Sequence, residues 1–245
     1  MKSRESLVII PTYNERENVQ DIIRAVLGYS DFEILIVDDG SPDGTADRVR
    51  EIMPEYPNIL HLIERSGKLG LGTAYIKGFK WGLERHYEYL FEMDADFSHN
   101  PTDLPRLLRA LKRDRVGVVV GSRYTPGGMV ENWPLNRQLI SYGASLYVRF
   151  ITWMPVKDPT AGFIGYRRKV LETLDLDKIE FIGYAFQIEM KFATWQNNFR
   201  IVELPITFKD RTKGTSKMSG SIVGEGMLGV LKMKWESLFG TRFKS

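Results

Sequence analysis

The stretch FEMDADFSHNP, residues 91–101, joins the end of an apolar run to the start of a helix-length segment through an acidic turn. The run Tyr89–Met93 has the length and composition of a buried strand, and residues 101–113 have the spacing of an amphipathic helix. A strand that leads directly into a helix is the repeating unit of a parallel α/β sheet. Asp94 and Asp96 therefore lie at the end of a predicted strand, where open α/β sheets bind ligands.

The same strand-to-helix unit recurs through the first half of the chain. Short apolar runs alternate with amphipathic segments, which is typical of a mostly parallel sheet flanked by helices. The predicted strands are Leu7–Ile10, Glu33–Val37, Ile59–Ile63, Tyr89–Met93 and Val116–Val120, and the predicted helices cover residues 15–28, 44–53, 72–85 and 101–113. We therefore predict a Rossmann-like α/β fold. No internal repeat or flexible linker divides the chain.

The composition limits the kinds of site that the chain can hold. Its 245 residues are 43% hydrophobic and 27% charged, which is typical of a globular protein with a full core. The lack of cysteine excludes disulfides and zinc–thiolate sites, and His61, His86 and His99 form no H-x-x-x-H pair. Any metal site is therefore predicted to consist of oxygen ligands.

The sequence carries no pattern of a secretory signal or of a membrane-spanning helix. Its longest uncharged apolar stretch, Gln138–Val148, is too short to span a bilayer, so we expect the protein in the cytoplasm. The net charge is only +3, but residues 207–245 carry eight Lys/Arg and three Asp/Glu. This basic end favours contact with an anionic partner or surface, and no nucleic-acid partner is predicted.

Two turns at the predicted sheet edge exclude common nucleotide motifs. The first strand runs into PTYNERENV, where Asn14 and Glu17 fit a capping box and no glycine provides a dinucleotide fingerprint. The third strand is followed by ERSGKLGLGTAY, in which Lys68 is followed by leucine, so it is not a Walker A loop. Gly70 and Gly72 are expected to permit a tight entry into a helix near Thr73. The alternative is that this loop faces a diphosphate.

The second predicted strand ends in VDDGSPDG. Asp38, Ser41 and Asp43 either build this turn and cap the next helix, or they face a ligand. Asp39 is the candidate for accepting hydrogen bonds from a ribose or a base edge.

The position of Asp94 and Asp96 separates them from a second D-x-D, residues 175–177, which follows no apolar strand. Two close carboxylates repel one another unless a cation is present, and Mg²⁺ or Mn²⁺ on a nucleotide diphosphate meets that need. The alternative is that Asp96 or Ser98 caps the next helix while Asp94 hydrogen-bonds the turn.

Taken together, these motifs resemble the family 2 glycosyltransferases, and within them the dolichyl-phosphate (polyprenol-phosphate) mannose synthases. The resemblance runs from VIIPTYNERENV through VDDGSPDGT, KLGLGTAYIKGF, MDADFSHNP, GSRY, GGMVENWPLNRQLIS and DPTAGF to KGTSK. It implies a GT-A fold with a catalytic domain over residues 1–206. Residues 207–245 would then form a basic loop and an amphipathic segment within the same domain.

The resemblance assigns a sugar-nucleotide site to the turns at the sheet edge. The guanosine part of GDP-mannose would be held by Pro11, Tyr13, Glu15, Val37 and Asp39. Asp94 and Asp96 would bind Mg²⁺ or Mn²⁺ on the diphosphate and act in catalysis, with Ala95 in contact through its backbone. Some relatives have glutamine where this chain has Ser98, which we leave out of the metal set.

The resemblance also assigns roles to basic residues. Arg123, in GSRY just past the fifth strand, is predicted to be catalytic and to hold phosphate oxygens, the alternative being a surface ion pair. Arg137 and Ser141 match the family's acceptor-phosphate segment. Arg211 and Lys217 match positions that close over the diphosphate, and the alternative is a solvated charged loop.

The implied reaction is an inverting, metal-dependent transfer of mannose from GDP-mannose to a polyprenyl (dolichyl-type) monophosphate. A lipid phosphate is largely a dianion at neutral pH, so it can attack the sugar without a general base. One alternative is a family 2 enzyme that uses another sugar nucleotide, such as UDP-glucose, on polyprenyl phosphate or a polysaccharide. A non-catalytic nucleotide-binding protein is the alternative from another class.

Two segments suit a membrane surface. Residues 139–156 give a broadly apolar helical stripe with aromatic residues, and the C-terminal segment mixes apolar residues with lysine and arginine. We expect peripheral association with the cytoplasmic face of a membrane. The alternatives are an ordinary packed helix for the first segment and a separate membrane-anchor subunit as the partner of the second.

Overall fold

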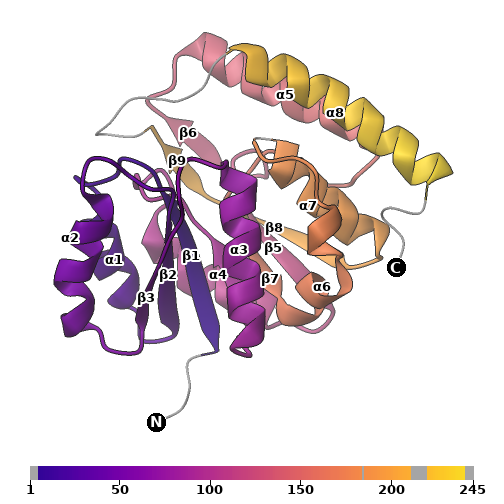
Figure 1. Cartoon of the computed structure of the whole chain (residues 1–245). Coiled ribbons are helices and arrows are strands. Elements are labelled where there is room, and N and C mark those ends of the chain that lie inside the picture. Colours follow the sequence, from indigo (N-terminus) through magenta and orange to yellow (C-terminus); the bar gives the residue numbers. More distant parts are fainter. Residues whose placement is uncertain (1–4, 184, 211–219, 241–245) are drawn as a thin grey trace.

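The structure, a computed structural model, describes residues 5–183, 185–210 and 220–240 (Figure 1). Its centre is a seven-stranded sheet in the order β3-β2-β1-β4-β7-β5-β8, in which β7 alone among these strands runs antiparallel to its neighbours. A separate pair, β6 and β9, is parallel. The strands are β1 Ser6–Thr12, β2 Phe32–Asp38, β3 Leu60–Glu64, β4 Tyr89–Glu92, β5 Val116–Ser122, β6 Met129–Glu131, β7 Ile164–Arg167, β8 Arg200–Pro205 and β9 Thr207–Lys209.

Helices cover both faces of the sheet (Figure 1). The α-helices are α1 Val19–Leu27, α2 Thr45–Ile52, α3 Leu71–Glu84, α4 Leu104–Leu111, α5 Leu135–Thr152, α6 Arg168–Thr173, α7 Ala185–Gln196 and α8 Gly220–Phe239. Short 3₁₀ turns occupy Met53–Glu55, Pro101–Asp103 and Leu176–Lys178. This arrangement confirms the α/β, mostly parallel fold that the sequence predicts.

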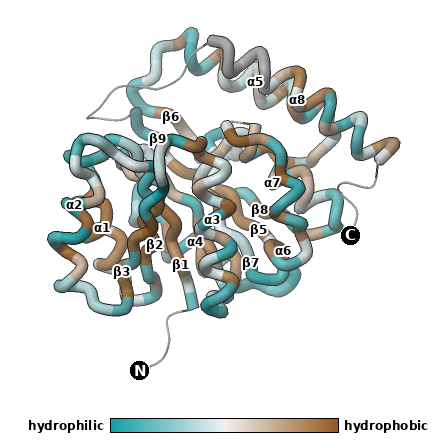
Figure 2. The backbone as a smooth tube through the Cα atoms, in the orientation of Figure 1, coloured by the Kyte–Doolittle hydropathy of each residue, from teal (hydrophilic) through white to brown (hydrophobic). Residues whose placement is uncertain are grey.

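The core consists of two layers, one on each face of the sheet. Along β1, Leu7 and Ile9 point into the layer under α3 and α7, whereas Val8 and Ile10 point into the layer under α1 and α4. Successive side chains of a strand face opposite sides, so a continuous apolar run is what a strand covered on both faces requires. Figure 2 accordingly shows the hydrophobic residues concentrated along the strands.

The five predicted strands correspond to β1–β5, and the four predicted helices correspond to α1–α4. The capping box at the first turn is wrong. Helix α1 begins at Val19 after Asn18, whose side chain makes no cap hydrogen bond. Asn14 has a φ of 57° and its N–H donates to Ser41 Oγ at 3.0 Å. The chain therefore makes a left-handed turn at Asn14 before the helix starts.

Helices α5 and α8 lie side by side along one edge of the molecule and contact each other (Figure 1). The Tyr147 hydroxyl of α5 donates to the Met227 carbonyl of α8 at 3.0 Å. Many of their large apolar side chains face outward: Leu135, Leu139, Ile140, Tyr142, Leu146, Phe150, Met227, Leu228, Leu231, Trp235, Leu238 and Phe239. No helix among the described residues has the length and apolar character needed to cross a membrane.

Candidate active site

The carboxyl ends of β1, β2 and β4 meet at one edge of the sheet. Strand β1 lies between β2 and β4, and Pro11 of β1 pairs in register with Val37 of β2. The turns that follow these strands are therefore neighbours. This edge brings together the donor residues predicted in the first two turns and the acidic turn at Asp94.

The turn after β2 is built by its own side chains. Asp38 accepts hydrogen bonds from the Thr12 hydroxyl at 2.8 Å and from the Ser41 backbone N–H at 2.8 Å. Asp43 accepts from the Thr45 backbone N–H at 3.0 Å, at the start of α2. The turn-building interpretation of Asp38, Ser41 and Asp43 is thus confirmed.

Asp39 lies in the same turn, but its side chain faces the loop after β3. Its carboxylate is 3.0 Å from the guanidinium of Arg65 without hydrogen-bond geometry, and it accepts from the Leu69 N–H at 3.2 Å. Burial raises the pKa of Asp39 above its usual value although Arg65 opposes the rise. Sequence reasoning missed Arg65, because nothing in the loop distinguishes it from a surface arginine. Asp39 as the ribose or base acceptor stays a prediction.

The remaining residues of the first two turns that are predicted to bind the sugar nucleotide differ in the groups that they offer to a ligand. The ring of Tyr13 lies 5.1 Å from the Lys68 ammonium, in a cation–π contact that joins the first turn to the loop after β3. Glu15 is fixed through its backbone, whose N–H donates to the Thr45 hydroxyl oxygen at 3.0 Å. The Val37 side chain is fully buried in the core, so only its backbone can meet a ligand. Pro11 is half-buried at the end of β1.

The loop after β3 enters α3 through Gly70, as the sequence predicts. Gly70 has a φ of 103°, and α3 begins at Leu71, one residue before the predicted helix of residues 72–85. A side chain at Gly70 would be strained in this conformation and would also press on Ile182. The loop is thus held closely against residues that precede α7.

The acidic turn after β4 is compact. Asp96 is nearly buried and its Oδ1 accepts from the Ser98 backbone N–H at 3.0 Å, whereas the Asp94 side chain is 38% exposed. Ala95 between them is buried. The helix-capping alternative is wrong, because Asn100 is the residue whose side chain accepts from Thr102 N–H at the helix start.

His99 stabilises this turn through its imidazole ring. Its Nδ1 accepts the backbone N–H of Asp94 at 3.1 Å, and its ring stacks on Phe163 with centroids 4.9 Å apart. Burial lowers the pKa of His99 to about 4, so the imidazole is neutral at pH 7 with its proton on Nε2. The 3.8 Å approach of Nδ1 to the Asp94 carboxylate is therefore no ion pair. Sequence reasoning noted His99 only as a histidine without a partner for zinc.

The oxygen ligands at this turn fit a hard divalent cation that is bound jointly by the protein and a substrate. Asp94 and Asp96 supply carboxylate oxygens, and the buried Ser98 hydroxyl has no hydrogen-bond partner among the described residues. No three acidic or histidine side chains converge as a complete metal cage in this part of the chain. Mg²⁺ and Mn²⁺ commonly take one or two carboxylates and complete their coordination with phosphate oxygens and water.

The second acidic triplet has a structural role. Asp175 accepts from the Asp177 N–H at the start of a 3₁₀ turn, and the exposed Asp177 carboxylate pairs with Lys80. It follows helix α6 and not a strand, as its sequence context predicts.

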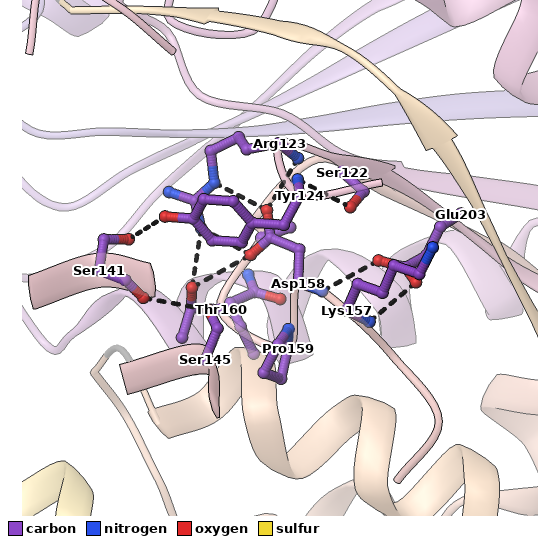
Figure 3. Close-up of polar contacts among 12 residues, drawn as sticks. Ser122, Arg123, Tyr124, Ser141, Ser145, Lys157, Asp158, Pro159, Thr160 and Glu203 are labelled. Carbon is purple, nitrogen blue, oxygen red and sulfur yellow. Dashed lines mark hydrogen bonds and ion pairs between the residues drawn. The ribbon is translucent and has the colours of Figure 1, made fainter. Parts of the chain in front are cut away.

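Arg123, at the end of β5, forms a buried ion pair (Figure 3). Its Nε and Nη2 donate to the two carboxylate oxygens of Asp158 at 2.8 and 2.7 Å, and Nη2 also donates to the Thr160 hydroxyl at 2.7 Å. The Arg123 side chain is 9% exposed and that of Asp158 is fully buried. The surface alternative is therefore wrong, and a direct contact from Arg123 to phosphate oxygens stays a prediction. Asp158 and Thr160 belong to the DPTAGF motif, which received no role from the sequence.

The predicted acceptor residues lie beside Arg123. Ser141 Oγ accepts from the Tyr124 hydroxyl at 2.7 Å (Figure 3). Arg137 donates to Asp210 at 2.9 Å, and its guanidinium lies 4.1 Å from the ring of Trp133. The same ring is 5.6 Å from the Arg123 guanidinium, so both arginines flank one indole.

Aromatic rings connect the acidic turn after β4 to the basic cluster that Arg123 and Arg137 form. Phe208 of β9 packs edge-on against His99 and against Trp133, with centroids 5.6 and 5.4 Å away. The backbone N–H of Lys209 also donates to the Ser98 carbonyl. The acidic turn and the predicted acceptor residues are therefore joined by packed aromatic side chains.

A buried lysine holds the DPTAGF loop in place. Lys191 of α7 donates to the carbonyls of Pro159, Ala161 and Gln187 at 2.7–3.0 Å. Burial lowers its pKa to about 8, against the attraction of the nearby Glu92. Burial likewise raises the pKa of Glu92 to about 8, although the Gln187 amide hydrogen-bonds its carboxyl group. The two predicted donor residues Arg211 and Lys217 lie outside the described residues.

Comparison with known proteins places this site in a family. Residues 7–175 match the model of Glycosyl transferase family 2. The chain is 48% identical over 237 residues to an undecaprenyl-phosphate mannosyltransferase of Micrococcus luteus, covering 95% of this chain and 96% of the relative. It is 48% identical over 229 residues to a polyprenol monophosphomannose synthase of Mycolicibacterium smegmatis, covering 93% and 86%. A dolichol-phosphate mannosyltransferase of Pyrococcus furiosus is 38% identical and is covered over 64% of its length.

Solved structures share the fold at low sequence identity. A glucosyl-3-phosphoglycerate synthase from Mycobacterium tuberculosis, solved with Mn²⁺ and uridine diphosphate, aligns with a TM-score of 0.68 at 17% identity over 96% of this chain and 78% of that one. A mannosyltransferase from Pyrobaculum calidifontis, solved with GDP-Man and Mn²⁺, aligns with a TM-score of 0.54 at 16% identity over 98% and 76%. These likenesses confirm the GT-A fold. The chain belongs to glycosyl transferase family 2, in the group of the polyprenol-phosphate mannose synthases, and it is a glycosyltransferase.

Proposed function

We propose that this enzyme transfers mannose from GDP-mannose to a polyprenyl (dolichyl-type) monophosphate. The observation that carries the proposal is the 48% identity to two mannosyl transferases whose names give an undecaprenyl or polyprenol phosphate, over nearly the whole chain. The site agrees with such substrates. An acidic turn suits a metal-bound diphosphate, and arginines beside it suit an acceptor phosphate.

On the donor side, the nucleotide lies at the ends of β1 and β2. Pro11, Tyr13, Glu15 and Asp39 line it, with backbone contacts from Val37 and Ala95, and Arg211 and Lys217 reach the diphosphate. Asp94 and Asp96 hold Mg²⁺ or Mn²⁺, which when bound neutralises charge on the departing GDP. The Mn²⁺ in solved GT-A neighbours supports this assignment.

On the acceptor side, Arg137 and Ser141 hold the lipid phosphate, and Arg123 lies next to them. An oxygen of the phosphate dianion attacks C1 of mannose, the bond from C1 to the GDP oxygen breaks, and the anomeric centre inverts. The attacking oxygen carries no proton, so the site needs no general base. The protein's contribution is the alignment of the two phosphates and the shielding of their charges.

The outward apolar side chains of α5 and α8 bind the enzyme peripherally to the cytoplasmic face of a membrane. Phe150, Leu228 and Phe239 are each at least 70% exposed, an unusual state for residues of this size. The exposed aromatic and aliphatic side chains of the two helices suit the membrane interface in which a polyprenyl phosphate is embedded. The rival occupant of the same face is a separate membrane-anchor subunit.

The proposal is tested by transfer of labelled mannose from GDP-mannose to a short polyprenyl phosphate. With Mg²⁺ or Mn²⁺ we expect label in the organic phase, and excess EDTA should abolish it because Asp94 and Asp96 act through the cation. Transfer that is unaffected by EDTA would contradict the metal role. A failure of transfer despite metal-dependent GDP binding would contradict the acceptor.

The identity of the nucleotide is tested separately by thermal unfolding. GDP with a divalent cation should raise the Tm, whereas UDP at the same concentration should not. At about a hundredfold excess over its Kd, a ligand that binds only the folded state stabilises it by about 2.7 kcal/mol. Protection by UDP and not by GDP would favour a different sugar nucleotide.

Replacement of His99 tests the support of the acidic turn. We expect His99→Ala to raise the metal concentration for half-maximal rate about 10- to 100-fold, the usual effect of removing a group that orients metal ligands. His99→Asn should recover part of this loss because its amide oxygen can accept the Asp94 N–H. A metal requirement unchanged in His99→Ala, measured in initial rates of the folded variant, would contradict the role of His99.

A further inference from the structure

The segment of residues 179–183, just before α7, packs against the start of α3. The Ile182 carbonyl accepts the backbone N–H of Gly72 at 2.9 Å. A Cβ at Gly70 would lie 3.2 Å from Ile182, and a Cβ at Gly72 would lie 2.8 Å from the Phe181 carbonyl oxygen. Contacts this close leave little space between the segment and the start of α3. The segment therefore limits where the loop that leads into α3 can lie.

That loop contacts two of the residues that are predicted to hold the guanosine. The backbone N–H of Leu69 donates to the Asp39 carboxylate at 3.2 Å, and the Lys68 ammonium lies 5.1 Å from the ring of Tyr13. Gly70 follows directly, so the end of this loop rests on residues 179–183. A shift of the segment would therefore move these groups relative to a bound nucleotide.

The segment also contacts α8. The Glu180 carboxylate pairs with the Lys232 ammonium at 2.6 Å, and a Cβ at Gly229 would lie 2.6 Å from the Phe181 ring. The segment thus lies between α8 and the start of α3. It connects a helix with outward apolar side chains to the candidate nucleotide site.

A buried carboxyl group on α7 holds this segment in place. Glu189 is fully buried, and its carboxyl oxygens accept the backbone N–H of Glu180 at 3.1 Å and that of Phe181 at 2.9 Å. A buried carboxyl group is costly unless it is hydrogen-bonded, and an apolar side chain could not accept these two N–H groups. Glu189 therefore fixes the backbone of the segment to the core of the protein.

We propose that Glu189 is a positioning residue of the nucleotide site. It holds residues 180–182 against the start of α3 and so fixes the loop that contacts Asp39 and Tyr13. This inference rests on the proposed donor site, but it is tested by GDP binding alone, without acceptor or transfer. A wild-type protein that binds no GDP would contradict the proposed donor. Wild-type binding that the variants below do not alter would contradict only the role of Glu189.

The test is calorimetric titration of GDP in Mg²⁺ into the folded, full-length variants. Glu189→Ala should raise the Kd for GDP about 10-fold, because the loss of a hydrogen bond at a buried group lowers the fraction of molecules with the loop in place by about that factor. Glu189→Gln keeps one oxygen that can accept an N–H, so its Kd should lie between those of Glu189→Ala and the wild type. The KM for polyprenyl phosphate should not change, whereas a general loss of structure would raise it too.

Ile182→Ala provides a second test that leaves the buried carboxyl group intact. The Ile182 side chain is 54% exposed, so its truncation should not prevent folding, but it removes part of the contact with Gly70. The Kd for GDP should rise in this variant as well. If Glu189→Ala does not fold, Ile182→Ala and Glu189→Gln decide the outcome.

The matched control is Glu203→Gln. The Glu203 carboxylate also accepts two backbone N–H groups, those of Lys157 and Asp158 at 2.8 and 2.9 Å (Figure 3). It lies on β8, at the opposite edge of the sheet from β3, so its replacement should leave the Kd for GDP unchanged. An equal rise in Glu203→Gln and Glu189→Gln would overturn the proposal, because general loosening would then explain the effect. Unchanged Kd values in the folded Glu189 and Ile182 variants would also overturn it.

Discussion

Asp96→Asn is expected to reduce kcat/KM for mannosyl transfer about 10²- to 10³-fold, the range seen when one group that stabilises developing charge is removed. The substitution keeps an oxygen that can accept the Ser98 N–H, so the turn after β4 should persist. It removes one negative charge from the pair of carboxylates, Asp94 and Asp96, that we propose as the metal ligands. Initial rates over a titration of Mg²⁺ or Mn²⁺ measure the effect. Added metal should recover only part of the rate.

The matched control for Asp96→Asn is Asp177→Asn, the same chemical change in the other D-x-D triplet. Asp177 is exposed and pairs with Lys80 on the surface, so its loss should leave kcat/KM unchanged. A folded Asp96→Asn enzyme with wild-type kcat/KM and metal dependence would contradict the metal role. An equal loss in both variants would show that the assay reports a general effect of charge.

The parts of the fold that the sequence predicts are those that local pattern determines. Strands β1, β2 and β5 are continuous apolar runs that end in polar turns, and both their faces are buried. A continuous apolar run of this kind indicates a strand of a parallel sheet that is buried on both faces. The helices α1 and α4 that cover one face show the expected amphipathic spacing.

The second half of the sheet is less visible in the sequence for physical reasons. Strand β7 has only four residues, and Gly165 within it is required because a Cβ there would lie 2.4 Å from Phe91. A glycine in a short apolar run weakens the strand signal. Helix α7 is buried from Ala185 to Thr194, so it lacks the polar face by which a helix is identified.

The sequence also predicts some residues of the candidate site and not others. Motif resemblance predicts roles for Asp94, Asp96, Arg137 and Ser141, because these residues occupy fixed positions after strands or within a helix. It does not reveal their partners. Arg65, which faces Asp39, and Lys191, which holds the DPTAGF loop, act across long sequence separations and depend on packing.

Asp158→Asn is expected to lower the free energy of unfolding by about 3–5 kcal/mol, the cost of leaving a buried charge without its partner. Asp158 accepts three hydrogen bonds from Arg123, two from the guanidinium and one from the backbone N–H. The substitution would place an amide N–H₂ against these donors. Urea unfolding of the two proteins at pH 7 measures the difference.

The pH dependence of that difference identifies the ion pair as its source. Burial alone would raise the pKa of Asp158, but the charge and hydrogen bonds of Arg123 outweigh it and hold the pKa below 3.8. A carboxyl group with a depressed folded-state pKa stabilises the protein above its ordinary pKa, and this contribution is lost as the pH falls through the folded-state value. The gap between wild type and Asp158→Asn should therefore narrow below about pH 4. Arg123→Met/Asp158→Asn should be more stable than Asp158→Asn alone, because it removes the unpaired guanidinium. If the double variant were less stable than the single one, the loss would come from packing of the arginine side chain and not from its charge.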